Sequence, residues 1–157
     1  MDNKLMTFEN AAFGKIRTLT IDGEPWFVAV DVCRALEIGN PTDAMRRLDA
    51  DERTLVSIEG ASNGLPVNAV NEPGLYTLIL GSRKPEAKAF KRWITHEVIP
   101  SIRKHGTYMT DSLLDALEAH PEAVPEYLNR LRSENARNRE LTRRLRLALP
   151  KAEYYDA

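Results

Sequence analysis

Residues 14–30, GKIRTLTIDGEPWFVAV, carry the pattern of a β-hairpin and set the fold class of the chain. Apolar Ile16, Leu19 and Ile21 are separated by polar residues, and a second apolar run, WFVAV, follows. The Asp22–Gly23 step between the two runs is typical of a tight hairpin turn, because both residue types tolerate positive φ angles. The stretch therefore predicts two antiparallel strands.

A pair of short helices is predicted directly after this hairpin, in residues 31–48. Gly39 stands where the end of a helix favours a left-handed residue. Asn40–Pro41 is typical of a helix start, because the amide caps a free N–H and the proline ring supplies a helical φ. The second helix would carry Arg46–Arg47 at its far end, so the segment predicts a helix, a tight turn and a helix.

A second hairpin is predicted from TLVSIE (54–59) and LPVNAV (65–70), which flank a loop rich in Gly, Ser and Asn. Asn71 then precedes a short apolar helix that Gly81 ends. We expect an α+β fold in which a small antiparallel sheet of hairpins packs with short helices, followed by a C-terminal helical tail.

The stretch 84–106, KPEAKAFKRWITHEVIPSIRKHG, sorts into an apolar and a cationic face at helical periodicity. Because proline cannot continue a helix without disturbance, a kink is expected between His96 and Pro100. We expect a helix over 84–99 that buries Phe90, Trp93, Ile94 and Val98 and leaves Lys84, Lys88, Lys91 and Arg92 exposed.

The last third of the chain differs in pattern, which predicts two domains, residues 1–108 and a tail over 109–157. Pro121 and Pro125 read as breaks before a helical run to Leu149, which Pro150 ends. Spacings of four and three define a seam of Val124, Leu128, Leu131, Asn135, Asn138, Thr142, Leu145 and Leu149. Two interpretations stay open: homo-oligomerisation through this C-terminal helix, or a helix folded back on its own domain.

Composition excludes several classes of protein. The 157 residues are 43% hydrophobic and 29% charged, with one cysteine, Cys33, so the chain has no intrachain disulfide or multi-cysteine metal site. The longest apolar runs are too short to span a membrane, and the start of the chain lacks the pattern of a signal peptide. We therefore expect a soluble cytoplasmic protein.

Residues for catalysis or cofactor binding are missing from the sequence. It contains no phosphate-binding glycine loop, and its three histidines are not spaced as metal ligands. Cys33 falls on the apolar side of a predicted helix, which favours a buried structural thiol over a nucleophile. We expect no enzyme, no cofactor and no metal.

Charge is unevenly distributed although the formal net charge is only −1. Residues 1–80 hold 7 Lys or Arg against 12 Asp or Glu, a net of −5, whereas residues 81–110 hold 7 against 2, a net of +5. Opposed blocks of this kind create local fields that the total conceals, although each block alone also fits a solvated surface.

Two stretches resemble the Bro-N domain of phage and prophage antirepressors and of insect-virus BRO proteins. They are PWFVAVDVCRALEIGNPTDAMRRL and NEPGLYTLILGSRKPEAKAFKRWITHEVIPSIRKHGTY, and the resemblance covers roughly residues 8–108. It implies a compact α+β domain that binds DNA, often within a regulator of lytic genes. Leu48 stands where a histidine is expected in many relatives, and the tail differs from the separate domains that commonly follow Bro-N.

Two functions are compatible with these patterns. The first is a phage-type transcriptional regulator that binds DNA, with arginines reading guanine edges and the basic helix contacting phosphates. The second is an antirepressor that grips a phage repressor protein without contacting DNA. Surface arginines on a short helical pair also occur in proteins that never bind nucleic acid, and the family resemblance is what favours DNA. The candidate DNA-binding residues are Asn40, Thr42, Arg46, Arg47, Arg83, Lys84, Lys88, Lys91 and Arg92.

Overall fold

A computed structural model describes residues 6–10, 13–58 and 64–148, and the chain divides into two compact units, Met1–Gly106 and Thr107–Ala157. Two predicted features, the loop over residues 60–63 and the end of the tail helix at Leu149–Pro150, lie outside the described residues. In the described part, no helix is long and apolar enough to cross a membrane.

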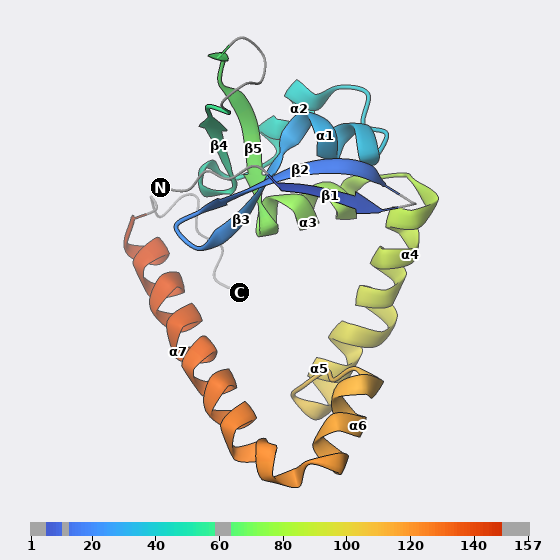
Figure 1. Cartoon of the computed structure of the whole chain (residues 1–157), viewed down its shortest axis with the longest axis vertical. Coiled ribbons are helices and arrows are strands. Elements are labelled where there is room, and N and C mark those ends of the chain that lie inside the picture. Colours follow the sequence, from blue (N-terminus) through green and yellow to red (C-terminus); the bar gives the residue numbers. More distant parts are fainter. Residues whose placement is uncertain (1–5, 11–12, 59–63, 149–157) are drawn as a thin grey trace. The chain divides into compact units, whose positions relative to one another are not determined.

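The first unit is built on a five-stranded antiparallel sheet in the order β1-β2-β3-β5-β4 (Figure 1). Its strands are β1 (Met6–Asn10), β2 (Gly14–Ile21), β3 (Glu24–Val28), β4 (Arg53–Val56) and β5 (Val67–Asn71). Both predicted hairpins are confirmed: β2 pairs with β3, and β4 pairs with β5. Asp22 (φ 53°) and Gly23 (φ 80°) make the first turn, which needs positive φ at both positions. Strand β1, which pairs with β2, was not predicted from the sequence.

The helices of this unit share one core with the sheet, which confirms the α+β prediction. They are α1 (Ala29–Ala35), α2 (Pro41–Arg46), α3 (Glu72–Gly81) and α4 (Pro85–Trp93), with a short 3-10 turn, η1 (Ala50–Glu52), before β4. Val32 and Cys33 of α1, Leu78 of α3 and Ala87 of α4 are buried in one cluster with Val70 of β5. Because strand side chains alternate, a second, smaller cluster lies on the opposite face of the sheet, around Leu19, Val28, Val56, Ile58 and Ala69.

Local hydrogen bonds fix where α1 ends and α2 begins. As predicted, the Asn40 side chain caps α2 by accepting the Asp43 backbone N–H at 3.1 Å. The prediction for Gly39 is wrong, because the left-handed residue is Glu37 (φ 57°). The Ile38 N–H donates to the Cys33 carbonyl and the Glu37 N–H to the Arg34 carbonyl. These two hydrogen bonds are the pattern of a Schellman cap. The helix therefore closes two residues earlier than the glycine suggested.

A buried carboxylate joins β2 to α1. Asp31, with a side chain only 3% exposed, accepts hydrogen bonds from the Arg17 backbone N–H at 2.9 Å and from its Nε at 2.8 Å and Nη2 at 3.0 Å. Arg34 lies 3.5 Å from the same carboxylate. Burial alone would raise the pKa of Asp31, but the hydrogen bonds from Arg17 and the charges of both arginines outweigh it and lower the pKa. The carboxylate thus stays ionised inside the fold.

Helix α4 continues through a π-helical turn, η3 (Ile94–Val98), into α5 (Ile99–His105), which Gly106 (φ 77°) ends. The Ile99 N–H donates to the Ile94 carbonyl, five residues back. Pro100 has no N–H to offer the His96 carbonyl, and the wider turn accommodates its ring in a single helical path. The predicted disturbance near Pro100 therefore takes the form of a π turn.

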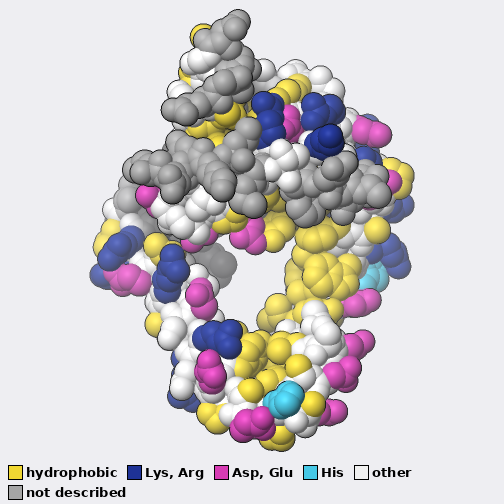
Figure 2. Space-filling model, viewed as in Figure 1, with side chains coloured by type: hydrophobic (Ala, Val, Ile, Leu, Met, Phe, Trp, Pro, Cys, Tyr) yellow, Lys and Arg dark blue, Asp and Glu magenta, His cyan; other side chains and the backbone are white. Residues whose placement is uncertain are grey.

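The predicted burial of the apolar face of this helix is wrong. Trp93 is 39% exposed, and Phe90 is only half-buried, because Ala87 is the one residue of α4 that reaches the core. The aromatic rings pack on one another instead, with centroids 6.0 Å apart for Tyr76 and Phe90 and 5.8 Å apart for Phe90 and Trp93. Figure 2 shows a band of hydrophobic side chains over α4 toward α5, with Lys and Arg on the other edge of α4. We call Phe90, Trp93, Ile99 and Ile102 the apolar band.

The second unit is helical. It consists of α6 (Asp111–Ala119), a 3-10 turn η4 (Pro121–Ala123) and α7 (Val124–Ala148). Pro121 lies between the helices as predicted, but Pro125 does not break the chain. It lies in the first turn of α7, where a missing N–H leaves no helical hydrogen bond unmade. Leu128 and Leu131 of α7 stay at the surface, 45% and 37% exposed.

We predict that Asp31→Asn lowers the free energy of unfolding by about 2–4 kcal/mol, because it leaves the Arg17 donors facing a neutral amide. Asp43→Asn is the matched control, since Asp43 forms an exposed ion pair with Arg47 at 3.1 Å. This control should cost less than about 1 kcal/mol. Urea unfolding measures both, and equal losses would contradict the role of Asp31.

The pH dependence of the same pair follows from the lowered pKa of Asp31. A carboxyl group with a depressed pKa in the folded state stabilises fully above its ordinary value, 3.8, and loses this effect as the pH falls through the folded-state value. The stability difference between the native chain and Asp31→Asn should therefore be constant near neutral pH and shrink below about pH 4. A difference that grows on acidification would have the wrong sign.

Candidate nucleic-acid interface

The four candidate residues around α2 lie together at the surface. Asn40 uses its side-chain oxygen to cap the helix, which ties this acceptor to the fold. Thr42, Arg46 and Arg47 are exposed. Arg47 pairs with Asp43 one turn earlier, whereas the Arg46 guanidinium has no hydrogen-bond or ion-pair partner among the described residues. Arg46 is therefore the cation of α2 that is available to a ligand.

A groove of about 500 Å³ separates α2 from the β4–β5 hairpin. Thr42 and Arg46 line one wall, and Arg53 and Asn68 line the other. The Arg53 Nη1 donates to the Met45 carbonyl at 2.8 Å, which ties β4 to the last turn of α2. Sequence reasoning missed Arg53 and Asn68, because only the pairing of two distant hairpin strands brings them beside α2.

The candidate residues of α4 and of the turn before it form a second, separate set. Arg83, Lys88 and Arg92 are exposed, and Lys91 is half-buried. In the described part of the chain, none of these four side chains takes part in an ion pair or a hydrogen bond. Lys88, Lys91 and Arg92 stand three and four residues apart, which places them on one face of the helix.

The prediction that Lys84 is exposed is wrong. This lysine is half-buried, and its Nζ donates to the Ala35 carbonyl at 2.8 Å and lies 5.3 Å from the centre of the Phe13 ring. The hydroxyl of Ser82, a buried residue, donates to the Leu36 carbonyl at 3.1 Å. These two donors satisfy carbonyl groups at the end of α1, which would otherwise lack partners. Lys84 is thus engaged in joining α4 to α1.

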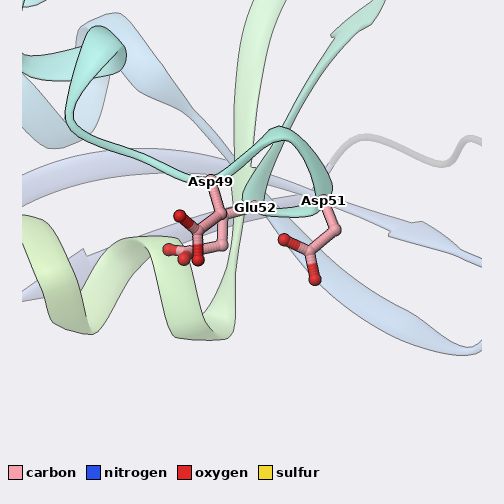
Figure 3. Close-up of side chains that lie close together, drawn as sticks. All are labelled: Asp49, Asp51 and Glu52. Carbon is pink, nitrogen blue, oxygen red and sulfur yellow. The ribbon is translucent and has the colours of Figure 1, made fainter. Parts of the chain in front are cut away.

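Acidic side chains cluster at η1 (Figure 3). Carboxylate oxygens of Asp49, Asp51 and Glu52 lie within 4.8 Å of one another, and the carboxylates of Asp49 and Glu52 are drawn side by side. Burial and the neighbouring Asp49 raise the pKa of Glu52. Asp49 and Asp51 are exposed, as expected of solvated loop charge, and exposed acidic groups gather in this way without a ligand.

Cys33 is fully buried, as predicted, and burial raises the pKa of its thiol. A raised pKa keeps sulfur in the protonated form, which is a poor nucleophile. The thiol accordingly behaves as a small apolar group of the core.

Comparison with known families confirms the resemblance found in the sequence. The pattern of the BRO family, N-terminal domain, matches residues 15–100, which run from β2 into α5 and include both candidate sets. It ends before α6 and α7.

Individual relatives cover a similar part of the chain. An uncharacterized protein of Haemophilus influenzae is 38% identical over 107 residues, which are 66% of this chain and 49% of that protein. A protein of Invertebrate iridescent virus 3, named for its Bro-N domain, is 28% identical over 137 residues, 64% of this chain and 34% of that protein. A similarly named protein of Invertebrate iridescent virus 6 is 28% identical over 123 residues, 65% of this chain and 29% of that protein. The chain spans half or less of the length of these curated relatives, and no solved structure matches it.

We predict that Lys84→Met lowers the free energy of unfolding by about 1–2 kcal/mol, because the Ala35 carbonyl loses its charged donor. Lys88→Met is the matched control, since Lys88 is exposed on the same helix. It should change stability by no more than about 0.5 kcal/mol. Thermal unfolding compares the two variants. Equal effects on stability would contradict the role of Lys84 in joining α4 to α1.

Proposed function

The chain belongs to the BRO family through its N-terminal domain, and from this premise we propose that it is a DNA-binding transcriptional regulator of the phage antirepressor type. We propose further that it is not an enzyme and acts only by binding. The observation that carries DNA binding is the set of cations on α4 and just before it, Arg83, Lys88, Lys91 and Arg92, which have no acidic partner among the described residues.

Cations without acidic partners suit a phosphate backbone. A surface lysine or arginine that is paired with a carboxylate must give up that pair before it binds an anion, whereas these four are free to bind directly. Contacts with phosphates position a protein on DNA and release counterions, but they carry no sequence information. We assign this role to α4.

Sequence preference is assigned to α2. Arginine can pair bidentately with the O6 and N7 of guanine, and the threonine methyl group can contact the methyl group of thymine. Arg46 and Thr42 offer these groups from the exposed side of the helix. Arg47 would first have to leave Asp43, so we expect a smaller part for it.

A protein partner is the second candidate, and the apolar band favours it. Trp93, Ile99 and Ile102 are exposed on one stretch of helix, and exposed apolar patches of this kind mark protein interfaces. In this alternative the chain grips a repressor through the apolar band without contacting DNA.

We predict that replacing Lys88, Lys91 and Arg92 together by Gln weakens binding to every DNA sequence. The slope of log affinity against log salt should become shallower by about 0.9 for each lost phosphate contact. Fluorescence anisotropy with random and operator-like duplexes measures both quantities.

The control for that experiment removes the same charge from the tail, by replacing Arg130, Arg132 and Arg139 with Gln. It should leave the affinity and the slope near the native values. Equal losses in both triple variants would mean that the net charge of the protein, and not the cations of α4, determines the DNA affinity. A native chain that binds no duplex at low salt would contradict DNA binding and favour the protein partner.

The tail is proposed as an assembly device. Leu128 and Leu131 are exposed on α7, and a stripe this narrow cannot be buried by a lone helix. Asn135 and Asn138 continue the seam, where polar residues tend to fix register and oligomer number.

We predict that the native chain is oligomeric and that Leu128→Glu with Leu131→Glu converts it to monomers, because charge is disfavoured in such a seam. Light scattering gives the mass directly. Arg132→Glu, at an exposed residue directly after Leu131, is the control and should keep the native mass. A native chain that is monomeric at high concentration would reject assembly.

A further inference from the structure

The groove between α2 and the β4–β5 hairpin has a second wall to which the proposed function gives no role. Asn68 and Val67 of β5 and Arg53 of β4 line this wall, opposite Thr42 and Arg46 of α2. Asn68 is exposed, and its side chain forms no hydrogen bond within the described part of the chain. Its amide can both donate and accept, so it is a free polar group in a recess.

The charge of the groove contrasts with that of its surroundings. Its lining includes Arg46 and Arg53 and no acidic residue, although residues 1–80 carry a net charge of −5. Three carboxylates adjoin lining residues in sequence, and none belongs to the lining. Asp31 is buried against Arg17, Asp43 lies 3.1 Å from Arg47, an arginine outside the lining, and Glu52 belongs to the acidic cluster at η1. Two guanidinium groups without a facing carboxylate favour an anionic ligand.

The two walls are held as one unit. The Arg53 side chain bonds to the Met45 carbonyl, and Met45 is itself buried in the core. β4 in turn is paired with β5 along the whole strand, with Leu55 opposite Asn68. Strand β5 is also paired with β3, which leads into α1. The position of Asn68 relative to α2 therefore rests on the Arg53 side-chain bond and on the pairing of β5 with both of its neighbours.

The chemistry of the lining also fits a nucleotide chain. Besides its cations the groove exposes apolar groups, with Val30 50% exposed, which can pack against sugars or a thymine methyl group. Asn and Arg side chains supply the paired donors and acceptors that read adenine and guanine. An acidic peptide would satisfy the arginines but would leave the amide and apolar groups less used.

We propose that the β4–β5 hairpin is the second half of the DNA-reading surface, and that Asn68 contacts the nucleic acid directly from the wall opposite Arg46. This inference rests on the proposed function and adds a residue and an element to it. DNA would lie in the groove with its negative charge between Arg46 and Arg53, while α2 and β5 approach it from either side.

The test is Asn68→Asp in the full chain, with Thr20→Asp as the matched control. Asn and Asp have nearly the same shape, so the change mainly adds a negative charge inside the groove. Thr20 is an exposed strand residue of the same sheet that does not line the groove, so the control adds the same charge elsewhere. Anisotropy at fixed salt should show DNA affinity reduced by about tenfold for Asn68→Asp and by less than about twofold for Thr20→Asp.

Folding is checked by thermal unfolding of both variants. If Asn68→Asp is destabilised, Asn68→Ala replaces it and should weaken binding several-fold. Equal affinities of the groove variant and the control, with DNA binding by the native chain intact, overturn the inference and leave the proposed function standing. If the native chain does not bind DNA, the proposed function itself is contradicted. Unchanged DNA affinity together with poly-L-glutamate binding that Asn68→Asp abolishes assigns the groove to an acidic peptide, which also overturns the inference.

Discussion

The structure depends on one buried carboxylate. At the point where β3 ends and the chain turns into α1, Asp31 accepts the backbone N–H and two side-chain nitrogens of Arg17 in β2. The pairing of β2 with β3 begins at Thr18, so Arg17 lies just outside it. Its backbone N–H donates to Asp31 instead of to a residue of β3. A carboxylate this deeply buried needs its charged partner, so the start of α1 is fixed against the sheet. The positions of α1 and of α2, which follows it, depend on this contact.

Three further polar contacts transmit this position to the proposed DNA surface. Ser82 and Lys84 donate to the carbonyls that end α1 and so anchor the beginning of α4. Arg53 donates to the Met45 carbonyl and so anchors the end of α2 on the hairpin. The cationic helix, the reading helix and the hairpin are thus each tied by a side-chain hydrogen bond to an element whose place is already set. This arrangement is what lets short elements hold side chains steadily at a surface.

Features that arise from neighbouring residues could be predicted, and those that arise from distant ones could not. The Asp22–Gly23 turn and the Asn40 cap are decided within four residues, and both were predicted correctly. The burial of Trp93 was predicted from periodicity alone, which identifies an apolar face but not whether anything covers it. Lys84 and Ala35 are 49 positions apart, so nothing local distinguishes this lysine from Lys88. Arg53 and Asn68 escaped notice for the same reason, since their place beside α2 follows from strand pairing.

Nuclear magnetic resonance of the full chain, titrated with a short duplex, tests the proposed DNA surface most directly, because it locates the contact without any substitution. We expect the amide signals of α2, of β5 around Asn68 and of the cationic side of α4 to shift together and to saturate at one ratio of DNA to protein. Signals around Leu19, in the smaller core cluster, should stay in place. Shifts confined to α7, or no shifts at equimolar DNA and low salt, would contradict a DNA-reading surface on this domain.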